Sequence, residues 1–191
     1  PVHLSLPSDA LENPLTAASV TPSPGAPKLE SNSLLSPENA RLIVTQLCAA
    51  QKPVVLVGPR GCYQFAKELR QLSEALGVPV IATESPRGVG DPSLGAFAEV
   101  LAQSDCVLLL EKRLDFTLKF GNSPTFKADA RFMQIDSEAT ELQRSQNALG
   151  SRLELAVQAD LLPSIETLSQ TTKSVQAKPQ DASWLPWVEE A

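Results

Sequence analysis

Short apolar runs alternate with amphipathic stretches through the middle of the chain. The runs are rich in valine, leucine and isoleucine, which is typical of strands that helices cover on both faces. Five such runs stand at residues 53–58, 78–83, 106–110, 132–136 and 153–157. We therefore predict an α/β fold: a doubly wound, mostly parallel, Rossmann-like sheet of five to six strands with helices on both faces.

The amphipathic stretches predict the helices. Ser36-Pro37 is typical of a helix start, with the serine as N-cap and the proline in the first turn, and Gly77 is typical of a helix end. The apolar stripes of the predicted helices are Ala40, Ile43, Val44, Leu47 and Cys48; Phe65, Leu69, Leu72 and Leu76; Phe97, Val100 and Leu101; and Leu162, Ile165 and Leu168.

The two ends of the chain lack this pattern. Residues 1–7 alternate like a single strand, and the proline-rich residues that follow have the composition of a linker. Trp184 and Trp187 stand near the other end with no obvious core to bury them. We predict a folded domain at 36–170, linkers at 13–35 and 171–191, and a stub of a preceding domain at 1–12, all severed from something larger.

Charge and cysteine usage narrow the class of partner. The net charge of −6 argues against a nucleic-acid or anionic membrane surface, and no stretch approaches the roughly 18 apolar residues of a membrane span. Cys48, Cys62 and Cys106 are widely spaced in apolar surroundings. This pattern is typical of buried thiols in a reducing compartment. We expect no nucleic-acid partner, no membrane and a cytoplasmic location.

A ligand of such a sheet is expected at the carboxyl ends of the strands, where the strand order reverses. Gly58-Pro59-Arg60-Gly61 follows the first run. Glycines at this turn let a phosphate approach backbone N–H groups, and Arg60 would add a charge-assisted contact. The turn matches neither GxGxxG nor a Walker loop, so a tight turn without a ligand is the favoured alternative.

Charged residues also follow the later runs. Arg113 and Asp115 stand just after the third run, where a binding site and a solvated ion pair are equally natural. Asp136 ends the fourth run and Asp160 follows the fifth, each just before a predicted helix. An aspartate in this place binds ribose hydroxyls or, more commonly, caps the next helix.

No catalytic site and no metal site is predicted for this chain. Its single histidine, His3, lies in the isolated strand at the start, so no histidine is available to assist Cys62 or to bind a metal in the folded domain. The sequence contains no GxSxG, CxxC or HExxH motif. A self-contained enzyme is therefore not expected.

Taken in order, these segments resemble the central domain of thiamine-diphosphate-dependent enzymes. Residues 53–58 resemble the family's "RPVLLxGGG", 76–80 its "LGxPV", 108–116 its "LLLGxRLxF", 135–136 its "ID" and 159–160 its "GD", while 1–7 resemble the closing strand of its pyrimidine-binding domain. The family includes acetolactate synthase, oxalyl-CoA decarboxylase, 2-hydroxyacyl-CoA lyase and benzaldehyde lyase. The likeness spans essentially the whole chain, and it is carried by the order and spacing of the segments.

The resemblance implies a larger parent enzyme. Such a parent has pyrimidine- and pyrophosphate-binding domains on either side of the central one, forms a homo-oligomer (a dimer or a tetramer) and binds thiamine diphosphate with magnesium. The GDG…N magnesium motif of the pyrophosphate-binding domain is missing, because Gly90-Asp91 is followed by Pro92. On this likeness the catalytic residues lie outside this chain.

The resemblance also implies a nucleotide site at the strand ends. Central domains of this family bind FAD, ADP or nothing, and the residues that match such a site by position are Gly58, Arg60, Gly61, Arg113, Asp136 and Asp160. Glu111 stands where the family commonly has glycine, which sets a carboxylate near any diphosphate. We therefore favour an empty or vestigial site.

Three hypotheses about function follow. The leading one is a structural, interdomain module of an acetolactate synthase-like lyase, decarboxylase or synthase acting on 2-keto acids or 2-hydroxyacyl groups. The second is a working nucleotide domain for ADP, CoA or FAD. The third, a stand-alone NAD-binding protein, is the least favoured because GxGxxG is missing.

Overall fold

The computed structural model describes residues 34–83, 87–175, 178–179 and 181–190. All of these belong to one compact unit. The predicted stub at 1–12 and nearly all of the predicted linker at 13–35 lie outside the described residues. Leu35, at the end of that linker, is buried in the core.

The described residues form one five-stranded sheet in the order β2-β1-β3-β4-β5, and every neighbouring pair is parallel. The strands are β1 (Pro53–Val57), β2 (Val80–Ala82), β3 (Cys106–Leu110), β4 (Arg131–Asp136) and β5 (Leu153–Gln158). The predicted parallel α/β sheet is confirmed. The second strand is shorter than its apolar run, and its half-buried residues match its place at the edge of the sheet.

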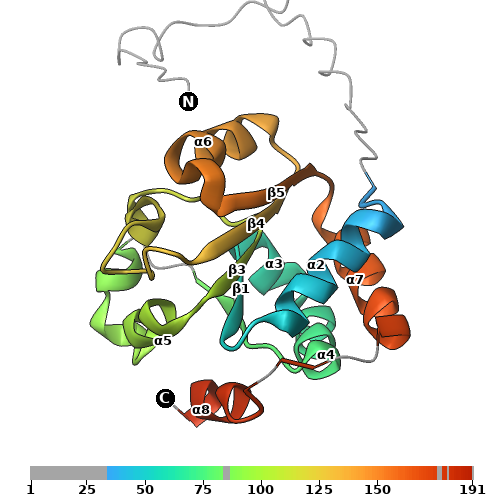
Figure 1. The fold of residues 1–191 in the computed structure, drawn as a ribbon, viewed down its shortest axis with the longest axis horizontal. Helices are drawn as coiled ribbons and strands as arrows, with labels where there is room; N and C mark the ends of the chain where they lie inside the picture. The colour runs from blue at the N-terminus through green and yellow to red at the C-terminus, as the bar shows by residue number, and fades with distance from the viewer. Residues whose placement is uncertain (1–33, 84–86, 176–177, 180, 191) are drawn as a thin grey trace, which may run out of the picture. The chain divides into compact units, whose positions relative to one another are not determined.

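Helices cover both faces of the sheet, so the doubly wound arrangement is confirmed (Figure 1). Side chains of α2 (Pro37–Ala49), α4 (Ala66–Leu76) and α7 (Leu161–Val175) pack with one face of the strands. On the other face, α5 (Phe97–Gln103) and α8 (Trp184–Glu190) pack with the alternate strand residues, and the last residue of α6 (Ala139–Leu149) joins them. Each central strand is thus buried on both sides, as its unbroken apolar run predicts.

The predicted helix ends are found where the sequence signals stand. The Ser36 side chain accepts a hydrogen bond from the Asn39 backbone N–H at 3.2 Å, and Pro37 begins α2. Gly77 ends α4 with a φ of 68°, in the left-handed region that favours glycine. One of the three residues predicted for the apolar stripe of α7 is wrong. Ile165 and Leu168 are buried as predicted, but the third buried apolar residue is Leu161, and Leu162 is half-buried.

Short helices fill the connections between these elements. They are α3 (Pro59–Gln64), η2 (Gly88–Gly90), η3 (Pro92–Leu94), η4 (Phe116–Gly121) and η5 (Gly150–Arg152). The turn predicted after the first strand is therefore itself the start of a helix, since Pro59 is the first residue of α3. Within the described ranges, no helix has the length and apolar character needed to cross a membrane.

The end of the chain corrects the expectation that both tryptophans lack a core. Trp184 begins α8 and is only 2% exposed, packed with the second face of the sheet, while Trp187 lies partly buried beside it. Local sequence pattern does not reveal this contact, because the hydrogen-bond partner of Trp184 is Pro53, 131 residues earlier. α7 also continues to Val175, beyond the predicted start of the second linker at 171.

Candidate functional site

The strand order reverses between β1 and β3. The chain leaves β1 toward β2 on one side of the sheet and returns to place β3 on the other, so the carboxyl ends of β1 and β3 border the switch point. Gly58 follows β1 and Glu111 follows β3. We call the region at these two strand ends the switch-point crevice, because ligands of such sheets bind there.

Gly58 brings the two strand ends into direct backbone contact. Its N–H donates to the carbonyl oxygen of Leu110 at 3.1 Å. A Cβ atom at this position would lie 2.0 Å from the carbonyl oxygen of Glu111. The glycine is therefore required by the neighbouring strand, whether or not a ligand binds.

Arg60 and Glu111 form an ion pair across the crevice. Arg60 lies in the first turn of α3, and one of its terminal nitrogens is 3.5 Å from the Glu111 carboxylate. The Glu111 side chain is 9% exposed, whereas that of Arg60 is 52% exposed. Glu111 also has a φ of 44°, an unusual conformation for a residue other than glycine.

The crevice is acidic beneath this pair. Burial raises the pKa of the Glu111 carboxyl, the Arg60 charge and a hydrogen bond to the Ser137 side chain oppose that rise, and the carboxylates of Asp136 and Asp160 add to it. At the Glu111 carboxyl, the charges of two further carboxylates thus act against that of one guanidinium. This charge balance disfavours a diphosphate.

Asp136 and Asp160 both have structural roles. The buried Asp136 accepts a hydrogen bond from the Glu138 backbone N–H at 2.9 Å, at the start of α6. Burial raises the pKa of its carboxyl, and that hydrogen bond opposes the rise. Asp160 immediately precedes α7, and its backbone carbonyl oxygen accepts from the Ser164 N–H at 3.2 Å and from the Ser164 hydroxyl.

Gly61 serves close packing of α3 on the sheet. A Cβ atom there would lie 2.3 Å from the Val57 side chain and 3.2 Å from that of Leu161. Five of the six residues that the sequence analysis assigned to a nucleotide site therefore lie around the crevice or directly beneath it, and each of the two glycines has a packing reason of its own.

Arg113 lies elsewhere. Its Nε is 3.6 Å from a carboxylate oxygen of Glu141 on α6, and it lines a separate cavity of about 500 Å³. Glu141 and its second partner Arg144 were not singled out from the sequence. Their spacing of three residues on a predicted helix was the available signal.

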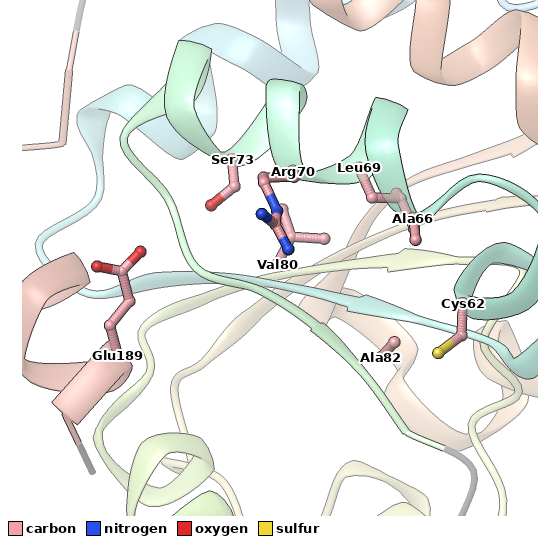
Figure 2. A pocket seen from close by; sticks show the side chains of 8 residues that line it. All are labelled: Cys62, Ala66, Leu69, Arg70, Ser73, Val80, Ala82 and Glu189. Carbon is pink, nitrogen blue, oxygen red and sulfur yellow. The ribbon is translucent and has the colours of Figure 1, made fainter.

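A further cavity, of about 280 Å³, lies beside the edge strand. Figure 2 shows it between α4 and β2, with Arg70 and Ser73 above Val80, Cys62 at one end and Glu189 of α8 facing it. None of the six predicted site residues lines it. Over the described part of the chain, no group of three or more His, Cys, Asp or Glu side chains is placed to hold a metal ion.

Comparison with known proteins gives one family. Residues 41–168 match the family described as thiamine pyrophosphate enzyme, central domain. The chain is 30% identical over 141 residues to 2-hydroxyacyl-CoA lyase 1 of Mus musculus, covering 71% of this chain and 24% of that protein. It is 28% identical over 162 residues to the acetolactate synthase of Mycobacterium bovis, covering 77% of this chain and 26% of that protein.

A plant relative gives a similar result. The 2-hydroxyacyl-CoA lyase of Arabidopsis thaliana is 30% identical over 114 residues, which are 56% of this chain and 20% of the plant protein. The chain therefore spans between a fifth and about a quarter of the length of these curated relatives.

Proposed function

The chain belongs to the thiamine pyrophosphate enzymes and matches their central domain, and from this premise we propose that residues 36–170 hold the catalytic domains of a larger enzyme in register. The family depends on thiamine pyrophosphate. We propose a parent enzyme that acts on 2-hydroxyacyl or 2-keto acid substrates, as a lyase, decarboxylase or synthase. The names of the relatives support this class of substrate.

We assign thiamine pyrophosphate and magnesium to other domains of the parent. The described residues do not fit them, because no metal-ligand cluster is present in those ranges and the switch-point crevice carries surplus carboxylates. We propose residues 1–12 as part of a pyrimidine-binding domain, 13–35 and 171–191 as links, and a pyrophosphate-binding domain as the second partner. We also propose that the parent enzyme forms a homo-oligomer, either a dimer or a tetramer, and is located in the cytoplasm.

The central observation is the ion pair between Arg60 and Glu111 at the switch point. Glu111 supplies the negative charge with which Arg60 would otherwise bind a phosphate, so it takes the place of the anion, and the backbones of Gly58 and Glu111 are already in contact. We therefore propose that the crevice does not bind FAD, ADP or CoA, and that the domain has an architectural role. The second candidate, a working nucleotide domain, is favoured by the position of Arg60 at the switch point with half of its side chain exposed.

Calorimetric titration of the chain with ADP, CoA and FAD separates the two candidates. We expect no heat of binding for any of the three up to about 1 mM, whereas a dissociation constant near 1 µM would establish a nucleotide site. Glu111→Gly is the matched variant, because glycine tolerates the φ of 44° and removes the carboxylate. ADP binding that appears only in this variant would show that Glu111 closes the crevice.

A further inference from the structure

The cavity that Arg113 lines is separate from the switch-point crevice. It measures about 500 Å³ and lies between the segment after β3, which includes η4, and α6. Cavities of this size hold small organic molecules. Arg113 and Phe120 come from the first segment, and Glu141, Arg144 and Asn147 come from the helix.

One buried carboxylate holds two guanidinium groups at this cavity. A single oxygen of Glu141 accepts a hydrogen bond from Arg144 at 2.7 Å and lies 3.6 Å from Nε of Arg113. The Glu141 side chain is 10% exposed, while the two arginine side chains are 66% and 65% exposed. Because a guanidinium has five N–H donors, each arginine keeps donors that are directed away from Glu141.

The charges at the cavity favour an anion. The other carboxylate that lines it is that of Asp115, which accepts hydrogen bonds from the backbone N–H and hydroxyl of Thr117. Asp115 also interacts with the buried Lys112: burial lowers the pKa of the lysine and the charge of Asp115 opposes that change. Two arginines and two carboxylates therefore line the cavity, and Lys112 adds a positive charge that interacts with Asp115.

Phe120 gives the cavity an aromatic wall. The side chain is 48% exposed, although an aromatic ring of this size is normally buried. Lys119 and Phe120 have φ values of 50° and 55°, a left-handed conformation that is unfavourable for residues other than glycine. The Phe120 N–H donates to the Asp115 carbonyl oxygen at 2.9 Å, which holds this conformation in place.

We propose that this cavity binds a small aromatic anion, with its carboxylate or phosphate on Arg113 and Arg144 and its ring against Phe120. Paired guanidinium groups are well suited to a two-oxygen anion, and an exposed aromatic face suits a flat apolar group. The proposal does not depend on the architectural role of the domain, since it involves different residues and a different surface.

Phenyl phosphate is the probe, titrated calorimetrically into the full chain at low salt. We expect a dissociation constant below about 1 mM, weakened about tenfold by Arg144→Gln. Phe120→Leu should weaken phenyl phosphate about threefold and leave inorganic phosphate unchanged. Arg70→Gln, which removes an exposed arginine of α4 at the other cavity, is the matched control and should bind like the wild type.

Three results would overturn the proposal. The first is that no heat of binding is measured up to about 10 mM phenyl phosphate. The second is that the wild type and Arg144→Gln bind phenyl phosphate with equal affinity. The third is that Arg70→Gln loses as much affinity as Arg144→Gln. Urea unfolding of each variant accompanies the titration. If Arg144→Gln unfolds more readily than the wild type, Arg113→Gln gives the same test from the other side of Glu141.

Discussion

The indole Nε1 of Trp184 donates a hydrogen bond to the carbonyl oxygen of Pro53, at 2.7 Å, and joins α8 to the first residue of β1. The Trp187 ring stacks on that of Trp184 with centroids 5.2 Å apart and planes 16° apart. The Lys52 ammonium lies 5.2 Å from the centre of the Trp184 ring. The last helix is therefore part of the core on the second face of the sheet.

We predict that Trp184→Ala lowers the free energy of unfolding by about 3–5 kcal/mol, because a fully buried aromatic side chain is removed. Trp184→Phe should cost about 1 kcal/mol for the lost hydrogen bond in addition to the smaller ring. Trp187→Ala is the control, since that residue is only partly buried. Urea unfolding measures all three, and equal losses for Trp184→Ala and Trp187→Ala would contradict the packing described.

Gly58 provides a second test of close backbone contact. We predict that Gly58→Ala lowers the free energy of unfolding by about 3 kcal/mol, because its Cβ would overlap the Glu111 carbonyl and the strand ends would have to separate. Gly90→Ala is the matched control, since a Cβ there meets nothing within 4 Å. It should leave stability unchanged or raise it slightly. A loss of similar size in both variants would mean that the loss at Gly58 does not come from overlap with the Glu111 carbonyl.

The sheet could be predicted from the sequence because its central strands are buried on both faces. A strand such as Cys106–Leu110 has no solvent-facing side, so it appears as an unbroken apolar run that cannot be mistaken for a half-exposed strand. The helix ends depend on local chemistry in the same way. Ser36 and Gly77 act on backbone atoms within a few residues of themselves, so the sequence alone contains the signal.

The partners that the site side chains contact could not be predicted, because they come from distant parts of the chain. Arg113 follows the same strand as Glu111, but the left-handed backbone at Glu111 intervenes, and Arg113 pairs with Glu141 on α6. The position of Trp184 depends on a carbonyl group 131 residues away. Sequence pattern carries information about residues that are close together along the chain. The partners in these contacts are far apart in the sequence.

The Glu111 carboxyl makes stability depend on pH. Because burial holds the pKa of this group above the ordinary value of 4.5, the unfolded chain loses the proton at a lower pH than the folded chain does. Stability contributed by the protonated form is therefore lost as the pH rises from that ordinary value to the raised one, and the loss persists at higher pH.

We predict that the free energy of unfolding of Glu111→Gln increases relative to that of the wild type as the pH rises from about 4 to about 7. The measurement is the difference between the two free energies of unfolding in urea at each pH. Glu99→Gln, at an exposed position on α5, is the control and should show no comparable change. A constant difference between Glu111→Gln and the wild type at both pH values would contradict the prediction.

Cys106 should resist thiol reagents for as long as the domain is folded. The side chain is fully buried as the first residue of β3, and burial raises the pKa of its thiol to about 12. At pH 8 this leaves about one thiolate in ten thousand, in a place that a reagent cannot reach. We predict that peptide mapping after iodoacetamide treatment finds Cys106 unmodified in the native protein and modified once urea unfolds it. Modification of Cys106 at the same rate in both conditions would mean that β3 opens readily at its first residue, contrary to its place in the centre of the sheet.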